Sequence, residues 1–365
     1  MIARITFLML LCLGIGSFVF AQEDSTAVED DFEDIDWSAY DFADEAAKVF
    51  CSNKITGLSP SQFISVGYDF QGPYDAAFSS IGEYQPGDAV DQEMARVLST
   101  QGIRISANVP VWSRNSLVVQ LGGVFWDNQY NFENPENLTN PVARALNENG
   151  LKRTGLNTTI FKPLNEKHFL LFQAQADLVG DYALNEFQSL GLLRYSAAAL
   201  FGWRTSDYFQ WGLGVARTYR VGNLNYIPIA LLNWTSLKSN WGAEVLFPAR
   251  AHMRYTFNSR SLAFFGYELQ GQSYRINGVS ETLDNQSLEI RRGEMRWRAM
   301  WQRQLVGFIW IQLQAGYRLN WSFDADVLPG GQEFFRGFFG DQPFAMLNTL
   351  GNPFYANVSI NLVSP

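Results

Sequence analysis

The stretch LEIRRGEMRWRAMWQRQLVGFIWIQLQAGYRLNWSF, from Leu288 to Phe323, decides the fold. In its second half, residues 308–323, the odd positions are apolar and the even positions from Gln312 onward are mostly polar. A period of two over this length predicts a β-strand, because successive side chains of a strand point to opposite faces. The predicted strand is also long: these 16 residues compare with the ~5–6 of a usual strand in a soluble protein.

The segment before it alternates in the same way and is predicted to be its hairpin partner. Met295 and Trp297 point one way, Arg296 and Arg298 point the other, and residues 303–307 form the turn. In a soluble sandwich the apolar face would pack against another sheet. In a membrane barrel it contacts lipid, while the polar face lines a wet interior. The length and the alternation favour an all-β fold, a transmembrane antiparallel β-barrel, over the sandwich.

The same alternation recurs along the chain and gives a strand count. About fourteen strands are predicted, with twelve as the alternative, because Pro248 weakens a short pair between residues 241 and 257. Tight turns alternate with long connections, and residues 71–100, 127–152 and 324–352 are predicted to be long loops. Bacterial barrels have an even strand number, short periplasmic turns and longer outer loops. The regular alternation of short and long connections therefore supports the predicted number of strands.

Aromatic residues near the predicted strand ends suggest two interfacial bands, as membrane barrels have. The predicted periplasmic band contains Trp112, Trp203, Tyr208, Trp234, Trp241 and Trp301, and the predicted outer band contains Trp126, Tyr130 and Trp321.

The N-terminus has the pattern of an exported protein. A start containing Arg4 is followed by an apolar run from Ile5 to Phe20 and by Ala21. This arrangement predicts a secretory signal peptide, residues 1–21, with Sec-type export and cleavage near Ala21. A transmembrane anchor is the alternative, but the run is short for one. Mature protein would retain one cysteine, Cys51, and therefore no internal disulfide.

Residues 22–57 are predicted to be an acidic, poorly ordered periplasmic tail, followed by the barrel over residues 58–365. The net charge is -9, and residues 22–48 hold eleven acidic side chains against Lys48 alone. The remaining acids and bases balance, so no basic patch for nucleic acid is expected. Aromatic residues such as Trp37 and Tyr40 punctuate the tail. A solvated tail is favoured, with two alternatives: docking to a periplasmic partner, or insertion into the barrel.

Three short stretches resemble a known family. Gly222 to Pro228 (GNLNYIP), Trp241 to Ala249 (WGAEVLFPA) and Arg254-Tyr255 are similar to an uncharacterised, domain-of-unknown-function family of outer-membrane β-barrels that is common in Bacteroidota. The resemblance covers about residues 60–363. It implies a barrel in the cell outer membrane of a Gram-negative bacterium, and it brings no activity, ligand or catalytic residue.

The sequence offers little for catalysis. The two histidines, His168 and His252, have no partner motif, and there is no Cys/His cluster for zinc and no phosphate-binding glycine loop. No catalytic residue, metal or cofactor is assigned, and an enzyme is the last of three hypotheses.

A set of charged residues is predicted to line the barrel interior on consecutive strands. One hypothesis is a brace of Glu–Arg pairs that fills the lumen, because charges inside a barrel must be paired or hydrated. The other is a lumen that binds or selects a solute, and an excess of arginine would favour anions. We therefore expect a porin-like channel or transporter for small polar or anionic solutes, or else a structural or surface-interaction barrel with a filled lumen. The predicted lumen-lining residues are Glu244, Arg254, Glu268, Arg296, Arg298 and Arg318.

Overall fold

The fold is a closed antiparallel β-barrel of fourteen strands, which confirms the predicted fold class and the higher strand count. The computed structural model describes residues 51, 54–85, 87–183, 193–219, 224–277, 279, 287–327 and 344–363. The signal peptide and residues 22–50 of the acidic tail lie outside the described residues. No helix among the described residues is long and apolar enough to cross a membrane.

Thirteen barrel strands correspond to single elements, β3–β14 and β17, and β1 and β2 together form one strand that is interrupted at residues 72–73. β17 is the last. The strands are β1 (Gln62–Gln71), β2 (Tyr74–Ser79), β3 (Gln92–Arg114), β4 (Leu117–Phe132), β5 (Leu151–Pro163), β6 (His168–Gly180), β7 (Arg194–Ser206), β8 (Phe209–Thr218), β9 (Asn225–Thr235), β10 (Trp241–Phe247), β11 (Arg250–Asn258), β12 (Ser261–Ile276), β13 (Leu288–Val306), β14 (Ile309–Ser322) and β17 (Phe354–Val363).

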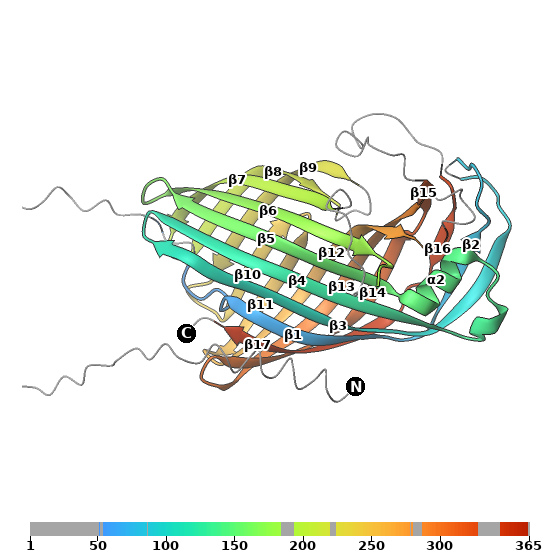
Figure 1. Cartoon of the computed structure of the whole chain (residues 1–365). Helices are drawn as coiled ribbons and strands as arrows, with labels where there is room; N and C mark the ends of the chain where they lie inside the picture. The colour runs from blue at the N-terminus through green and yellow to red at the C-terminus, as the bar shows by residue number, and fades with distance from the viewer. Residues whose placement is uncertain are drawn as a thin grey trace, which may run out of the picture. The chain divides into compact units, whose positions relative to one another are not determined.

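The barrel closes where the first strand pairs with the last. β1 is antiparallel to β17, with Val66 opposite Ile360, and β17 pairs on its other side with β14. The deciding stretch forms the hairpin β13–β14, in which Trp297 lies opposite Tyr317. We call the end with the tight turns and Val363 the turn end, and the opposite end the loop end (Figure 1).

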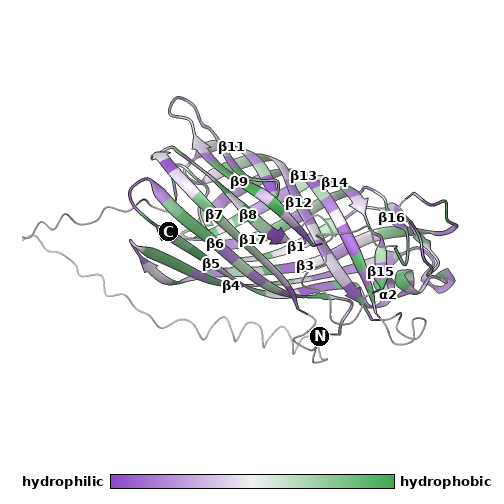
Figure 2. Ribbon diagram, turned by 90° about the horizontal axis from the view of Figure 1, so that it is seen from above, coloured by the Kyte–Doolittle hydropathy of each residue, from purple (hydrophilic) through white to green (hydrophobic). Residues whose placement is uncertain are grey.

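The outer surface of the barrel is apolar. Hydrophobic and hydrophilic residues alternate along the strands (Figure 2), and large hydrophobic side chains such as Leu213, Phe265 and Val358 are exposed on the outside. A monomeric soluble protein rarely exposes so continuous an apolar surface, whereas a lipid-facing wall requires it. Trp112, Trp234, Trp241 and Trp321 are exposed as the two aromatic bands require.

The assignment of Trp126 and Tyr130 to an outer aromatic band is wrong. Both point into the barrel: Trp126 lines an interior cavity, and Tyr130 is buried in a core at the loop end. They lie at even positions of β4, which is the inner face of that strand, because the neighbouring Phe132 is also buried.

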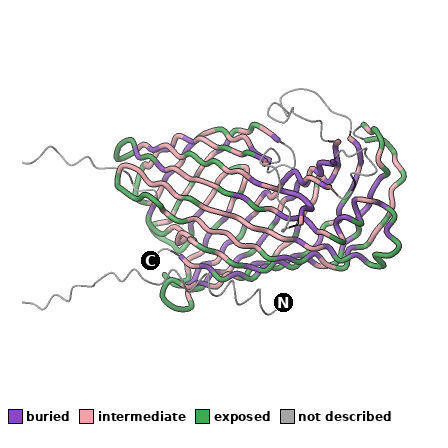
Figure 3. Tube along the Cα trace, in the orientation of Figure 1, coloured by how far each residue is buried: buried purple, intermediate pink, exposed green. Residues whose placement is uncertain are grey.

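The segments predicted to be long loops contain short strands and helices among their described residues. β2 and the first residues of β3 occupy residues 71–100, and residues 127–152 contain the end of β4, a 3-10 helix η2 (Pro135–Asn137) and the helix α2 (Pro141–Asn149). β15 (Ala325–Val327) and β16 (Asn348–Leu350) lie within residues 324–352. These pieces enclose an apolar core at the loop end, where buried residues gather (Figure 3). It includes Phe78, Phe132, Leu146, Ile290, Phe323 and Met346.

The five strands β7–β11 extend less far toward the loop end than the other strands of the barrel. Arg250 at the start of β11 lies opposite Glu268, so residues 269–276 of β12 continue beyond β11. At that level β12 meets β6 instead: Arg275 pairs with Gly180, and Asp181 N donates to Arg275 O at 3.1 Å. The loop end is therefore a narrower ring, which omits β7–β11. The ring runs through β2, β3, β4, β5, β6, β12, β13, β15 and β16 and back to β2.

The chain before β1 follows the turn end of the barrel. Cys51 N donates to Asn165 O at 3.0 Å in the β5–β6 turn, and Thr56 N donates to Asp207 O at 2.7 Å in the β7–β8 turn. Ser59 reaches the interior, where its N and Oγ donate to the carboxylate of Glu244 at 3.0 and 2.8 Å. Burial raises the pKa of the Cys51 thiol, which therefore stays protonated at neutral pH.

A charge on the outer wall should destabilise the barrel. Leu213→Arg places a guanidinium against lipid near the middle of β8, and we expect a loss of about 2–4 kcal/mol in the free energy of unfolding. Urea unfolding in phospholipid vesicles, followed by tryptophan fluorescence, measures it. The matched control is Gln173→Arg, on the inner face of β6, which should lose far less. Equal losses would contradict the assignment of inner and outer faces.

Candidate functional site

The six charged residues selected from the sequence all lie on the inner face, in three groups. Glu244 and Arg254 form the first, near the turn end. Arg254 Nη1 lies 2.5 Å from Glu244 Oε1, and Arg254 Nη2 donates to Thr235 Oγ1 at 2.8 Å. Because Glu244 also accepts from Ser59, this pair fastens the segment before β1 to the inner wall.

Glu268 and Arg298 form the second group, an ion pair between adjacent strands β12 and β13. Arg298 Nε also donates to Nε2 of His252 at 3.0 Å. His252, which the sequence left without a partner, is thus buried as a hydrogen-bond acceptor for an arginine. This contact requires a neutral ring whose Nε2 carries no proton.

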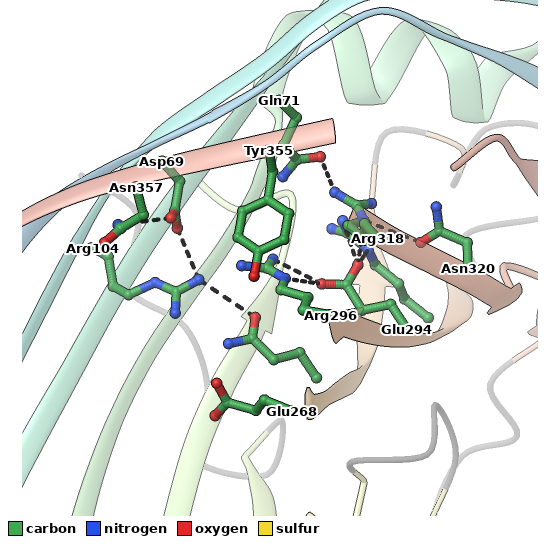
Figure 4. Close-up of polar contacts among 12 residues, drawn as sticks. Asp69, Gln71, Arg104, Glu268, Glu294, Arg296, Arg318, Asn320, Tyr355 and Asn357 are labelled. Carbon is green, nitrogen blue, oxygen red and sulfur yellow. Dashed lines mark hydrogen bonds and ion pairs between the residues drawn. The ribbon is translucent and has the colours of Figure 1, made fainter. Parts of the chain in front are cut away.

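Arg296 and Arg318 meet at Glu294, which the sequence interpretation omitted. Glu294 Oε1 is 2.7 Å from Arg296 Nη2, and Glu294 Oε2 is 2.8 Å from Arg318 Nε and 3.0 Å from Arg292 Nη2 (Figure 4). Gln71 and Asn320 accept further hydrogen bonds from Arg318. Three guanidinium groups on one carboxylate leave an excess of positive charge. All four residues are almost fully buried.

A second row of polar side chains crosses strands β3, β4 and β5. Arg104, Trp126 and Arg153 are opposite one another in register. The guanidinium carbons of Arg104 and Arg153 lie 4.2 and 4.8 Å from the centre of the indole ring, which is cation–π geometry. An ion pair holds each end of the row: Arg104 with Asp69 at 2.8 Å, and Arg153 with Asp177 at 2.9 Å.

The cluster around Glu294 and the row Arg104–Trp126–Arg153 both border one cavity of about 190 Å³. Five arginines line it against three carboxylates. Contacts cross the lumen here, since Arg104 Nη2 donates to Gln270 Oε1 at 3.4 Å and Gln272 Nε2 donates to Asp177 Oδ2 at 3.3 Å. An apolar part of the wall comes from β7, β8, β9 and β10, with Ser196 and Thr218 beside it. This apolar part consists of Ala198, Ala216, Ile227, Ile229 and Leu246.

The cavity lies at the level where β7–β11 end. Its lining includes Ala197 and Arg217, which are opposite each other in register and belong to the outward-facing positions of β7 and β8. The cavity therefore reaches the loop-end edge of the panel of strands β7–β11. The apolar core lies on the loop-end side of the cavity. The pair Glu244–Arg254, with Ser59, lies on its turn-end side.

Of the six residues selected from the sequence, the structure brings two to the cavity, Glu268 and Arg296. The sequence interpretation missed Glu294 and Arg292, although both have the even parity of Arg296 on β13. It also missed Arg104 and Arg153, although the alternation along β3 and β5 would have predicted that both face inward. Their contact with Trp126 could not be predicted in this way, because it depends on the register of three strands.

The arrangement can bind an anion. Arginine donors in a confined space form charge-assisted hydrogen bonds to an anionic group. Within the part of the chain that the structure describes, no group of three His, Cys, Asp or Glu residues is placed to hold a metal ion.

Comparison with known proteins identifies the family. The family model described as Domain of unknown function (DUF6268) matches residues 75–326. The chain belongs to this family. The resemblance to a domain-of-unknown-function family is thereby confirmed. A search of curated proteins finds no match.

Solved structures with similar architecture are outer-membrane proteins of Pseudomonas. An outer membrane channel from Pseudomonas putida F1 is 10% identical, with a TM-score of 0.36, over 84% of this chain and 97% of that one. The Pseudomonas putida toluene transporter TodX is 9% identical (TM-score 0.32; 86% and 99% covered). A Pseudomonas aeruginosa FadL homologue is 9% identical (TM-score 0.34; 82% and 90% covered). TM-scores this low carry no argument about mechanism or solute.

Removing the shared carboxylate should destabilise the barrel. Glu294→Gln leaves Arg292, Arg296 and Arg318 without their common anion, and breaking a buried ion pair costs about 3–5 kcal/mol. Urea unfolding in vesicles measures this loss. Glu268→Gln is the matched control: it separates one arginine from a less deeply buried carboxylate, so its loss should be smaller. A loss for Glu294→Gln no greater than the control's would show that the cluster does not hold the wall together.

Proposed function

We propose that this protein is an outer-membrane channel or transporter that carries small polar or anionic solutes through its interior cavity. The single observation that supports this most is the excess positive charge around Glu294, next to a cavity of about 190 Å³. A purely structural wall would be served by equal numbers of acids and bases. Extra guanidinium groups in a confined, low-dielectric space attract anions.

The described residues favour a narrow, selective route over a wide pore. The apolar core fills the ring at the loop end, and the segment containing Ser59 reaches into the turn end. A solute would therefore occupy the cavity as a discrete site. Conduction through a site requires binding that is favourable enough for entry and weak enough for exit.

The orientation follows from the turns. In bacterial barrels the short turns face the periplasm and the long connections face outward. The turn end, along which Cys51 and Thr56 lie, would then be periplasmic, after Sec-type export and cleavage near Ala21. A periplasmic partner that recognises the acidic tail is part of the proposal, and no catalytic role is assigned.

A structural or surface-interaction barrel is the second candidate. The apolar core at the loop end favours it, because β2, α2, β15 and β16 there form a packed extension beyond the lipid-facing wall. Such a barrel would act through this extension and would pass no solute.

Ion selectivity in a planar bilayer separates the two candidates. The refolded protein in a potassium chloride gradient should give a small, anion-favoured conductance. Arg296→Gln, which removes one cavity-lining charge, should lower the ratio of anion to cation permeability by about twofold or more. Arg303→Gln, at an exposed position of the turn end, is the control and should change nothing.

Two results would contradict the channel. A cation-favoured conductance would show that the arginine excess does not govern passage. The absence of both conductance and liposome swelling by small anions, from protein shown to be inserted by its resistance to unfolding, would favour the structural barrel.

A further inference from the structure

The row Arg104–Trp126–Arg153 carries donors that no residue of the described chain satisfies. Trp126 Nε1, Arg104 Nε and Arg153 Nε are buried and have no hydrogen-bond partner. All three residues line the cavity. One terminal nitrogen of each arginine, Nη2, pairs with Asp69 or Asp177, so the charge of each arginine is balanced while its Nε–H has no partner.

Unpaired buried donors are unfavourable by about 1–3 kcal/mol each, and folded proteins rarely retain several side by side. Here three occur on three adjacent strands, held in place by stacking on one indole ring. An acceptor with several oxygens, such as a carboxylate, is the kind of group that pairs with such donors. Charge-assisted hydrogen bonds of this kind are roughly twice as strong as neutral ones.

The apolar wall of the same cavity specifies the rest of the ligand. Ala216, Ile229 and Leu246 present carbon atoms to the cavity, beside the polar residues Ser196 and Thr218 of β7 and β8. The cavity volume of about 190 Å³ is somewhat larger than the ~150 Å³ apolar cavity that accepts benzene. The space thus fits roughly six to eight non-hydrogen atoms.

We propose that Arg104, Trp126 and Arg153 bind the acidic group of a small amphipathic anion, whose apolar part lies against the wall formed by β7–β10. This inference rests on the proposed function and names the substrate class of the same cavity. It distinguishes the cavity from a general anion pore, where inorganic ions and small hydrophilic acids would be preferred.

Saturation-transfer NMR on the full barrel in amphipol, which avoids detergent, tests the inference with three probes. Hexanoate has both parts, acetate has the acid alone, and hexanol has the apolar part alone. We expect hexanoate to bind at least about fivefold more tightly than either of the others, which corresponds to about 1 kcal/mol per lost contact. Equal affinity for hexanoate and hexanol, or for hexanoate and acetate, would overturn the proposal.

Variants assign the two ends of the ligand. Trp126→Phe keeps an aromatic ring and removes the indole N–H, and it should weaken hexanoate binding by about fivefold while leaving hexanol binding unchanged. Ile229→Ala should weaken hexanoate by about threefold and leave acetate unchanged. The matched control is Trp112→Phe, because Arg114 lies 4.8 Å over that exposed ring and reproduces the stacking outside the cavity. Unchanged hexanoate binding in Trp126→Phe would overturn the site.

Failure of this inference and failure of the proposed function give different results. Anion-favoured conductance without a preference for hexanoate would leave the channel standing and remove the amphipathic substrate. Binding of hexanoate in a barrel without conductance would leave the site standing and remove the transport role.

Discussion

The rest of the structure depends on the hydrogen-bond seam between β1 and β17. A strand in lipid has no water to satisfy its backbone N–H and C=O groups, so an open sheet edge in the membrane is prohibitively unfavourable. Pairing the first strand with the last removes the edge and separates an apolar outside from an enclosed inside. Every charged side chain of the interior lies where it does because this closure created a lipid-free compartment.

The charged side chains of this enclosed interior are stabilised by ion pairs between neighbouring strands. Arg254, Arg298 and Arg153 each have a carboxylate partner on a neighbouring strand, so these pairs also tie adjacent strands together. The cluster at Glu294 departs from one-to-one pairing, and the row through Trp126 departs from full satisfaction of its donors. Departures from pairing and satisfaction commonly mark a site of function in an otherwise consistent fold. In this barrel both border the same cavity.

The alternation of polar and apolar residues predicted the strands of the barrel wall correctly, but it did not predict the structure at the loop end. The alternation of residues 308–323 predicted a strand that the structure places at Ile309–Ser322, with Leu313, Tyr317 and Trp321 exposed on the lipid side. Phe323 continues the pattern but turns inward, because β14 has ended and the residue joins the loop-end core. The predicted loops 71–100 and 324–352 fail for the same reason. Their short strands are stabilised by contacts between distant segments, such as β16 with β2, which no local period contains.

Parity predicted which charges face inward, because a period of two fixes the face of every residue in a strand once one is known. It did not predict their partners. The contact of Arg318 with Gln71 spans β17 and depends on how β14 and β1 pair with that strand. The contact of Gln272 with Asp177 joins β12 to β6, near the place where these two strands meet.

That junction also divides the barrel into parts with different freedom to vary. The ring at the loop end is complete without β7–β11, so these five strands form a panel that only the lower barrel requires. Changes within the strands of this panel would leave the pairings that close the ring in place. The side of the cavity formed by β7–β10 can therefore change without altering the ring, whereas Arg104, Arg153 and Arg296 belong to strands that the ring includes.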